Sequence, residues 1–365
     1  MIKVLVISTV NFGYGGGITN VIMNYYHSID KSKVHMDFVV SKCIDDKLKQ
    51  EVLDGGSKLY ELSYRLKSPL KYLKKVKEII KSGEYDIVHA HGNSCTLAIE
   101  MIAAKKGGAK IRIPHCHNTT TNYKVVHKLL RNKFDKNYTN GFACGEKAGE
   151  WLYAGKPFTV VNNGIDVKRY MFNDADRQKY RRKLGFDGCK VVGNVGAINY
   201  QKNHEFLVDI FSELYKLDNS YRLLIVGDGN LRSDVNNKIA RLGLTNAVTF
   251  TGKSREVPQL MQAMDMIVMP SRYEGLPLTL LEAQSSCLQC FVSDVITQEA
   301  GVTDLVKYVS LEKQPKEWAK IINDTEAVNR GLQKNECISQ ITASGYNIEE
   351  NAKTLKDLYQ DFLNT

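Results

Sequence analysis

Two glutamates flank the start of a predicted helix in the C-terminal half of the chain. Residues 269–283 read MPSRYEGLPLTLLEA, and Pro277 is expected to be the first helical residue, where its missing N–H costs nothing. The free N–H groups and the positive dipole end of a helix start suit a phosphate. Glu282 lies roughly 7.5 Å further along the axis, where its carboxylate could accept hydrogen bonds from a ribose diol. Glu274 lies just before the helix, beside that phosphate position. The segment therefore fits a nucleotide-sugar, although the dipole alone also favours a glutamate at a helix start.

Four histidines form two pairs in the N-terminal half, His89 with His91 and His115 with His117. Alternate residues of a strand point to one face, so each pair is expected to share a face at a strand end. A metal site would need further ligands, and no carboxylate or cysteine is spaced to join the histidines. We therefore expect no metal ion, and a structural role for His89 and His115.

Two other motifs resemble phosphate or metal sites. Residues 13–17, GYGGG, link a predicted strand to a predicted helix and could hold a phosphate, but they lack the G-x-G-x-x-G spacing. A flexible turn is the alternative interpretation. Asp174 and Asp176 form a D-x-D motif that does not follow a strand, so we interpret it as solvated charge in a linker.

The elements that must position these residues alternate between β-rich runs and helical segments, which indicates parallel sheets with crossover helices. The pattern runs once from the N-terminus and restarts near residue 190, which predicts two α/β domains joined between residues 163 and 177. Open α/β sheets bind ligands at the carboxyl ends of their strands, so the active site is expected in a cleft between the domains. The expected strands cover residues 3–9, 34–40, 85–89, 110–113, 190–196, 222–226, 248–250, 266–269 and 290–292.

Charge is distributed unevenly over the 365 residues. Residues 1–165 contain 25 Lys and Arg against 14 Asp and Glu, whereas the net charge of the whole chain is +10. This excess predicts an anionic partner for the N-terminal half. Two clusters stand out: a helix over 70–81, and the cations Lys124, Lys128, Arg131, Lys133 and Lys136. They could form a platform for anionic lipid, or be sheet-packing helices with a solvated lysine face.

Several features place the protein in the cytoplasm. No apolar run approaches the roughly 20 residues of a membrane helix, and the first strand lacks a cleavage site for a signal peptide. The eight cysteines are scattered and form no disulfide framework. We expect a cytoplasmic protein with peripheral contact at the inner face of the cell membrane through its basic half.

With these motifs in order, the sequence resembles the retaining glycosyltransferase family 4, which has the GT-B fold. The segment from Glu274 to Glu282 is similar to its Glu-x7-Glu motif, and residues 201–203, 226–229, 250–252 and 162–166 resemble its other conserved loops. The resemblance is closest to bacterial enzymes of capsular and exopolysaccharide biosynthesis. It implies two Rossmann-like α/β/α domains that face each other across a cleft. These would be residues 1–168, joined by a C-terminal helix over 348–365, and residues 169–347.

The resemblance also implies roles for individual residues. Glu274 would contact the transferred sugar, Glu282 the ribose, and Lys202 the diphosphate, where it would stabilise the charge that builds on the leaving group. His117 would lie beside the donor sugar and the acceptor. The remaining donor-side positions are Gly16, Gly17, Gly227, Gly252, Gly275, Leu276 and Leu278, and the acceptor-side positions are Asn118 and Thr119.

One position departs from the family pattern: Ala197 stands where the family has an arginine on the diphosphate. The resemblance still predicts a retaining, metal-independent transfer from a UDP-sugar to a glycan or lipid-linked glycan, with no other cofactor. UDP is expected from its frequency in the family alone. The alternatives are a nucleotide-sugar epimerase of similar fold and a non-catalytic protein that binds a nucleotide-sugar or RNA. The chain has no RNA-binding aromatic motif, so no nucleic acid is expected.

Overall fold

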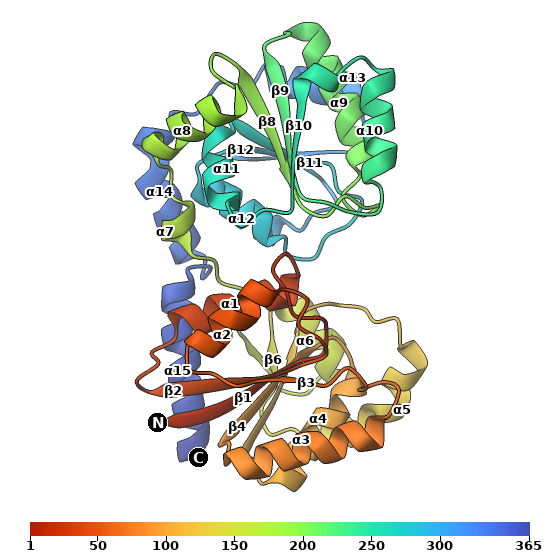
Figure 1. Cartoon of the computed structure of the whole chain (residues 1–365), viewed down its shortest axis with the longest axis vertical. Coiled ribbons are helices and arrows are strands. Elements are labelled where there is room, and N and C mark those ends of the chain that lie inside the picture. Colours follow the sequence, from red (N-terminus) through yellow and green to blue (C-terminus); the bar gives the residue numbers. More distant parts are fainter. The chain divides into compact units, whose positions relative to one another are not determined.

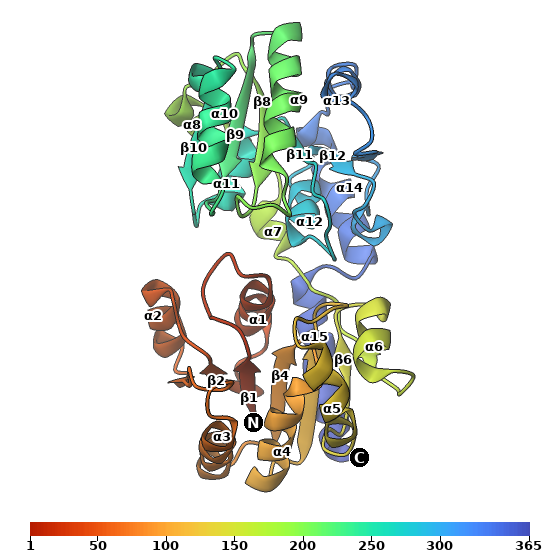
Figure 2. The ribbon, with the colours of Figure 1, turned by 90° about the vertical axis from the view of Figure 1, so that its right-hand side faces the viewer.

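The computed structural model describes residues 1–365, which divide into two α/β units (Figures 1 and 2). Unit 1 comprises Met1–Gly164 and Ile348–Thr365, and unit 2 comprises Ile165–Asn347. The division after Gly164 falls within the join expected between residues 163 and 177, four residues before the boundary expected after residue 168. None of the helices combines the length and the apolar composition that crossing a bilayer requires.

Unit 1 is built on a seven-stranded parallel sheet in the order β3-β2-β1-β4-β5-β6-β7. The arrows of β1 and β4 point the same way in Figure 2, as the parallel register requires. Its central strands are buried on both faces, which explains their nearly continuous apolar sequences. The strands are β1 (Ile2–Ser8), β2 (Val34–Val40), β3 (Leu59–Glu61), β4 (Ile87–Gly92), β5 (Ile111–Cys116), β6 (Phe142–Ala143) and β7 (Thr159–Val160).

Helices cover both faces of this sheet. One face packs against α3, α4 and α6 around a single apolar cluster, and α5 lies against α4 and the short helix η1. The other face carries α1 and the last helix of the chain, α15. The helices are α1 (Gly17–Ser28), α2 (Asp46–Asp54), α3 (Pro69–Gly83), η1 (Cys95–Leu97), α4 (Ala98–Gly107), α5 (Lys124–Asp135), α6 (Glu146–Tyr153) and α15 (Ile348–Asn364).

Unit 2 contains a six-stranded parallel sheet in the order β10-β9-β8-β11-β12-β13, with helices on both faces. The strands are β8 (Lys190–Val195), β9 (Tyr221–Val226), β10 (Val248–Gly252), β11 (Met266–Met269), β12 (Gln289–Ser293) and β13 (Val306–Val309).

Two apolar clusters form the core of unit 2. Helices α9, α10 and α13 pack on one face of the sheet, and α8, α11 and α12 pack on the other. The helices of this unit are α7 (Val167–Tyr170), α8 (Asp174–Leu184), α9 (His204–Leu217), α10 (Arg232–Arg241), η2 (Thr245–Ala247), α11 (Val257–Ala263), α12 (Leu278–Ser285), η3 (Gln298–Ala300), α13 (Pro315–Asn323) and α14 (Arg330–Ala343).

Three local predictions are wrong. The expected linker around the D-x-D motif is helical, because Asn173 caps α8 by accepting a hydrogen bond from the backbone N–H of Asp176. Pro277 precedes α12 as its N-cap and is not its first helical residue. Strands β4 and β5 extend to Gly92 and Cys116, so His91 and His115 lie inside strands.

Candidate functional site

Three glycines end the first three strands of unit 2 and let their backbones approach closely. Gly196, Gly227 and Gly252 all have positive φ angles, of 153°, 145° and 69°. The N–H of Gly227 donates to the carbonyl of Gly252 over 2.9 Å, and the N–H of Gly196 donates to the carbonyl of Val226 over 3.0 Å. A Cβ atom on Gly227 would lie 1.9 Å from the carbonyl oxygen of Gly196. Only glycine fits here, so the sheet presents bare backbone at its carboxyl edge.

Lys202 and Glu274 form an ion pair at this edge. The Nζ of Lys202 lies 2.6 Å from Oε1 of Glu274, and their side chains are only 16% and 7% exposed. The methylene stem of Lys202 passes over Gly196, whose missing side chain leaves room for it. A lysine and a glutamate that are 72 residues apart therefore meet beside the ends of β8 and β11.

Polar side chains hold Glu274 in place. Gln201 donates to one carboxylate oxygen over 3.0 Å, and the Ser271 hydroxyl donates to the other over 2.9 Å. Asn203 donates to the carbonyl of Pro270 over 3.0 Å and so ties the loop after β8 to the loop after β11. The Glu274 carboxylate is thus oriented without its lysine, which leaves Lys202 able to turn toward another anion.

The start of α12 provides backbone donors next to this pair. Gly275 is exposed and Leu276 is partly buried in the loop before the helix, and Leu278 is the first helical residue. A Cβ atom on Gly275 would have no neighbour within 4 Å, so there is open space beside its backbone. The N–H groups of the first helical turn lack intrahelical acceptors, and the dipole of α12 adds positive potential at the same end.

Glu282 lies further along α12 and has a perturbed acidity. Burial raises the pKa of its carboxyl group to about 7, against the lowering effects of a hydrogen bond with Tyr170 and of the charges of Arg169 and Lys202. The side chain keeps part of its surface accessible to solvent. A carboxyl group that titrates near neutrality is a frequent property of ligand-binding sites.

Four histidine rings stack in unit 1 on the face that α15 covers. The His89 and His115 rings are joined by a hydrogen bond of 3.0 Å, and the His91 and His117 rings by one of 2.8 Å. The two hydrogen-bonded pairs stack on each other. The ring centroids of His89 and His91 are 4.3 Å apart, and those of His115 and His117 are 4.2 Å apart. Tyr359 of α15 completes the chain with a hydrogen bond of 2.7 Å to Nδ1 of His89.

Burial keeps these imidazoles neutral. It lowers the pKa of His89 to about 3 and that of His117 to about 4, and it holds the pKa values of His91 and His115 well below their usual range. The nitrogens of His89, His91 and His115 lie within 4.8 Å of one another, a separation that a metal ion could bridge. Most of these nitrogens already serve the hydrogen bonds of the stack, however, so an ion would have to replace those bonds. The observed geometry is that of a hydrogen-bonded stack.

The other predicted residues of unit 1 lie at the carboxyl ends of its strands. His117 follows β5, and its backbone N–H donates to the side chain of Asn93 over 3.2 Å. Asn118 and Thr119 are exposed in the loop that leads to α5. Gly16 is the N-cap of α1 and Gly17 is its first residue, with no side-chain cap on the helix.

Sequence reasoning missed several residues that shape these sites. Gln201 and Ser271 lie in segments that the sequence analysis singled out, but their bonds to Glu274 depend on contacts that no local pattern shows. Tyr170, which bonds Glu282, lies outside those segments. No pattern in the sequence distinguishes Tyr359 of the last helix, which bonds His89. Arg272 was also missed: it donates to the carbonyl of Tyr200 over 2.7 Å and brings a guanidinium group to the loop that carries Ala197.

Two α/β units, each built on a parallel sheet, with a helix start suited to a phosphate in the second unit, are typical of the GT-B glycosyltransferases, and comparisons with known proteins agree. The family description "Glycosyl transferases group 1" matches residues 176–339, and "Glycosyltransferase Family 4" matches residues 15–169. The structure of HepE (Alr3699) from Anabaena in complex with UDP and glucose superposes with a TM-score of 0.77 at 19% identity, over 99% of this chain and 100% of that one. This likeness confirms the predicted fold class.

Sequence relatives identify the family. A protein named as a glycosyltransferase, EpsF of Bacillus subtilis (strain 168), is 34% identical over 362 residues, which cover 94% of this chain and 93% of EpsF. An Escherichia coli UDP-Gal:α-D-GlcNAc-diphosphoundecaprenol α-1,3-galactosyltransferase is 27% identical over 80% of each chain. The chain belongs to glycosyltransferase family 4, and the prediction of a transferase is confirmed.

Proposed function

We propose that this protein is a retaining, metal-independent glycosyltransferase that uses a UDP-sugar, bound by unit 2, to extend a glycan or lipid-linked glycan in polysaccharide biosynthesis. The observation that carries the proposal is the Lys202–Glu274 pair, 2.6 Å long, beside the start of the helix that carries Glu282. One short segment thus offers groups for a sugar, a diphosphate and a ribose.

The donor would lie along this segment. Backbone N–H groups near Gly275, Leu276 and Leu278 would bind the diphosphate, and Glu282 would accept hydrogen bonds from the ribose hydroxyls. Lys202 would turn from Glu274 to the diphosphate and stabilise the negative charge that the leaving group gains in the transition state. Glu274 would keep its bonds to Gln201 and Ser271 and contact hydroxyls of the transferred sugar.

Uridine is supported by relatives and not by a residue of this chain. The Escherichia coli relative is named for UDP-Gal, and the solved structures of HepE contain UDP, glucose or UDP-glucose. The relative AmsD is named for the biosynthesis of amylovoran, which supports a role in polysaccharide assembly. Retention fits the lack of a paired carboxylate nucleophile and base near Lys202, since the leaving phosphate could itself accept the acceptor's proton.

The proposal can be tested by thermal shifts with UDP, GDP, ADP, NAD and UDP-sugars, with and without EDTA. A ligand at 100 times its Kd adds about 2.7 kcal/mol of stability, which is readily measured. We expect stabilisation by uridine compounds that EDTA leaves unchanged and that Glu282→Ala abolishes. Glu336→Ala, an exposed glutamate of the same unit, is the matched control.

A response to GDP, ADP or NAD in place of uridine compounds would refute the donor assignment. Turnover separates the remaining alternatives, because an epimerase would convert the UDP-sugar without an acceptor and a non-catalytic binding protein would not convert it. A transferase releases UDP at a rate that rises with added glycan acceptor.

A further inference from the structure

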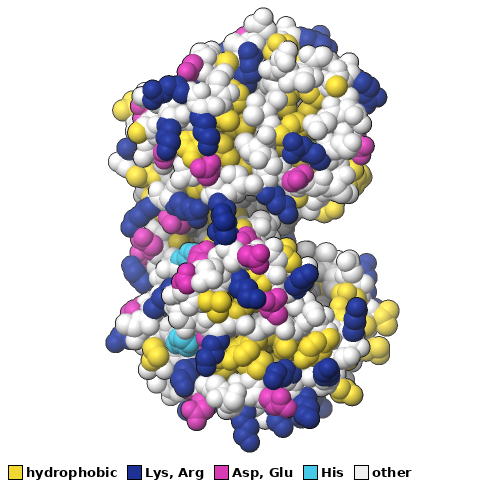
Figure 3. Space-filling model, in the orientation of Figure 1, with side chains coloured by type: hydrophobic (Ala, Val, Ile, Leu, Met, Phe, Trp, Pro, Cys, Tyr) yellow, Lys and Arg dark blue, Asp and Glu magenta, His cyan; other side chains and the backbone are white.

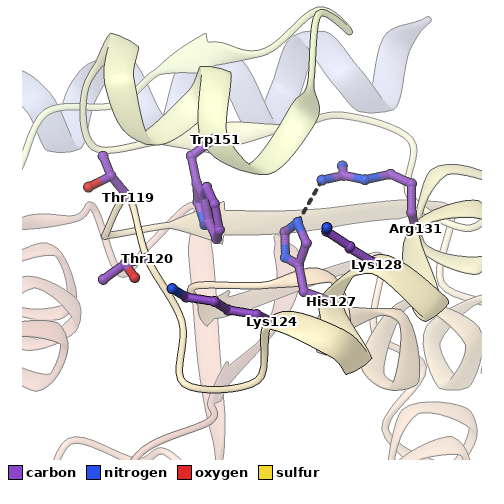
Figure 4. A pocket seen from close by; sticks show the side chains of 7 residues that line it. All are labelled: Thr119, Thr120, Lys124, His127, Lys128, Arg131 and Trp151. Atoms are coloured by element: carbon purple, nitrogen blue, oxygen red, sulfur yellow. Dashed lines mark hydrogen bonds between the residues drawn. The ribbon is translucent and has the colours of Figure 1, made fainter.

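A cavity of about 590 Å³ lies on unit 1, beside the end of β5. Its walls come from the loop before α5, from α5 and from α6, as Figure 4 shows. Its volume falls within the roughly 300–1,000 Å³ that is usual for small-molecule sites. The side chains that line it are Thr119, Thr120, Lys124, His127, Lys128, Arg131 and Trp151.

The lining carries three cations and no acidic side chain. Lys124 and Lys128 are one helical turn apart on the same side of α5, and neither pairs with a carboxylate. Arg131 lies 3.8 Å from Asp135, which also pairs with Lys156 at 3.2 Å. Like charges around one cavity repel each other, so an anion with several oxygens would relieve that repulsion and accept hydrogen bonds from the lysines.

His127 lies between two hydrogen-bond donors at the wall of this cavity. Its Nδ1 faces the backbone N–H of Cys95 at 3.3 Å, and its Nε2 faces a guanidinium nitrogen of Arg131 at 2.9 Å. A neutral imidazole has one acceptor nitrogen, so it cannot satisfy both donors. One of the two donors, the Cys95 N–H or the Arg131 guanidinium, therefore lacks an acceptor on the ring. Arg131 also donates to the Leu152 carbonyl, and its five N–H groups leave further donors for an oxyanion in the cavity. The ring stacks on Trp151 with centroids 4.8 Å apart, which makes that wall firm.

The same helix exposes an apolar strip. Val125 is 71% and Leu129 is 75% exposed, one turn apart, and Tyr123 and Val126 beside them are 48% and 41% exposed. By contrast, α3 buries Tyr72, Val76, Ile79 and Ile80 against the sheet, so it is a packing helix. In Figure 3, hydrophobic and basic side chains lie next to each other at the edge of unit 1 where Figure 1 places α5. A helix with exposed apolar residues beside cations suits the surface of a membrane.

We propose that this cavity binds the diphosphate of a lipid-linked acceptor. Lys124, Lys128 and Arg131 would contact the phosphates, and Val125 and Leu129 would lie in the headgroup region of the bilayer. A free sugar phosphate could use the cations but would leave the apolar strip in water. This inference rests on the proposed function, because it makes the acceptor a glycan on a lipid diphosphate. The loop that supplies Thr119 directly follows His117, which would let the acceptor glycan extend from the cavity toward that residue.

The test titrates farnesyl diphosphate, inorganic diphosphate and farnesol into the protein and follows the fluorescence of Trp151. The second tryptophan, Trp318, is fully buried in unit 2 and supplies a constant background. We expect farnesyl diphosphate to bind at least about tenfold more tightly than inorganic diphosphate, and farnesol to give no saturable change.

Three double variants locate the site. Lys124→Ala with Lys128→Ala should raise the Kd of farnesyl diphosphate at least about tenfold, which is what one charge-assisted hydrogen bond contributes. Lys133→Ala with Lys136→Ala removes the same charge from α5 and the residue after it, outside the cavity, and should change the Kd less than about twofold. Val125→Ser with Leu129→Ser should weaken farnesyl diphosphate binding and leave inorganic diphosphate unchanged.

Other outcomes would overturn the inference. Equal affinity for farnesyl and inorganic diphosphate would show a site for free phosphates. Equal losses of affinity in the Lys124→Ala, Lys128→Ala variant and the Lys133→Ala, Lys136→Ala variant would show attraction to any anionic surface. Vesicles containing about 20% phosphatidylglycerol should then bind the two variants equally. The thermal shift with UDP reports on unit 2 and should survive in Lys124→Ala with Lys128→Ala. If UDP gave no thermal shift in any variant, that result would count against the proposed donor site and would not affect the inference about the lipid site.

Discussion

Glu282 shows how burial changes the chemistry of one residue. Its pKa of about 7 means that the ligand-free protein holds a mixture of neutral and ionised carboxyl groups at neutral pH. Because the pKa lies above the ordinary value of 4.5, the contribution of this group to stability is greatest below about pH 4.5 and is lost as the pH rises toward 7. Ribose hydroxyls would act in the opposite direction, since they hydrogen-bond best to the ionised form.

We therefore predict that UDP binds more tightly as the pH rises from about 6 to about 8, by up to about tenfold per pH unit below the pKa. Titration calorimetry in buffers of different ionisation enthalpy would also detect the proton released on binding. Glu282→Gln should bind weakly at every pH. A pH-independent Kd in the wild type would remove Glu282 from the ribose site.

Lys202 allows a second prediction at this scale. Lys202→Ala should lower kcat by about 100- to 1,000-fold with a smaller change in KM, as expected for a charge that acts mainly in the transition state. Glu274 keeps its hydrogen bonds to Gln201 and Ser271, so the Tm should change little. Lys190→Ala removes a lysine of the same unit that pairs with Asp218, and its kcat should match the wild type. Full activity of Lys202→Ala would refute the role.

At the scale of elements, the loops after the strands of unit 2 contain two kinds of glycine: some pack against other backbone atoms, and others border open space. Gly227 has a φ of 145° and lies against the Gly196 carbonyl, whereas a Cβ atom added to Gly275 would have no neighbour within 4 Å. The first glycine allows three strand ends to approach one another. The second borders the space at the start of α12.

The two positions should respond differently to alanine. Gly227→Ala should destabilise unit 2 by roughly 2 kcal/mol or more, through strain and the contact with Gly196. Gly275→Ala should keep the wild-type Tm without ligand and lose affinity for UDP-sugars, because its methyl group would occupy the proposed diphosphate position. Denaturant melts and thermal shifts measure both effects. An unaltered UDP-sugar affinity in Gly275→Ala would place the donor elsewhere.

At the scale of the whole molecule, unit 1 is completed by the end of the chain. Helix α15 returns to the first sheet, and its Tyr359 bonds the histidine stack of β4 and β5. The stack is folded with neutral rings whose pKa values lie below the ordinary 6.5. The unfolded chain therefore binds more protons than the folded one below about pH 6.5, and the stability of unit 1 falls as the pH falls.

We predict that amide protection in β4 and β5 drops between about pH 7 and about pH 5, by up to about 1.4 kcal/mol per pH unit for each proton. Hydrogen exchange followed by mass spectrometry resolves the two units. Strands β8 and β9 are the internal control, because unit 2 has one such histidine, His204, with a pKa of about 4. Tyr359→Phe should lower protection in β4 at every pH. Equal acid sensitivity of both units would contradict this account.

Local patterns in the sequence were enough to predict the alternation of strands and helices, the two-unit α/β architecture and the family. These features depend on hydrophobic periodicity and on short motifs, which are encoded within a few consecutive residues. The segment from Glu274 to Glu282 is such a motif, and its helix begins one residue later than expected because Pro277 takes the N-cap position.

Which distant residues meet could be seen only in the folded chain. Lys202 reaches Glu274 because β8 and β11 are neighbours in the sheet order, and the histidines stack because β4 and β5 pair in parallel beneath α15. Periodicity also predicts that an amphipathic helix buries its apolar side, as α3 does, but it cannot show that Val125 and Leu129 of α5 are left in solvent. Strand order and the packing of helices depend on contacts across the whole chain, which no local pattern contains.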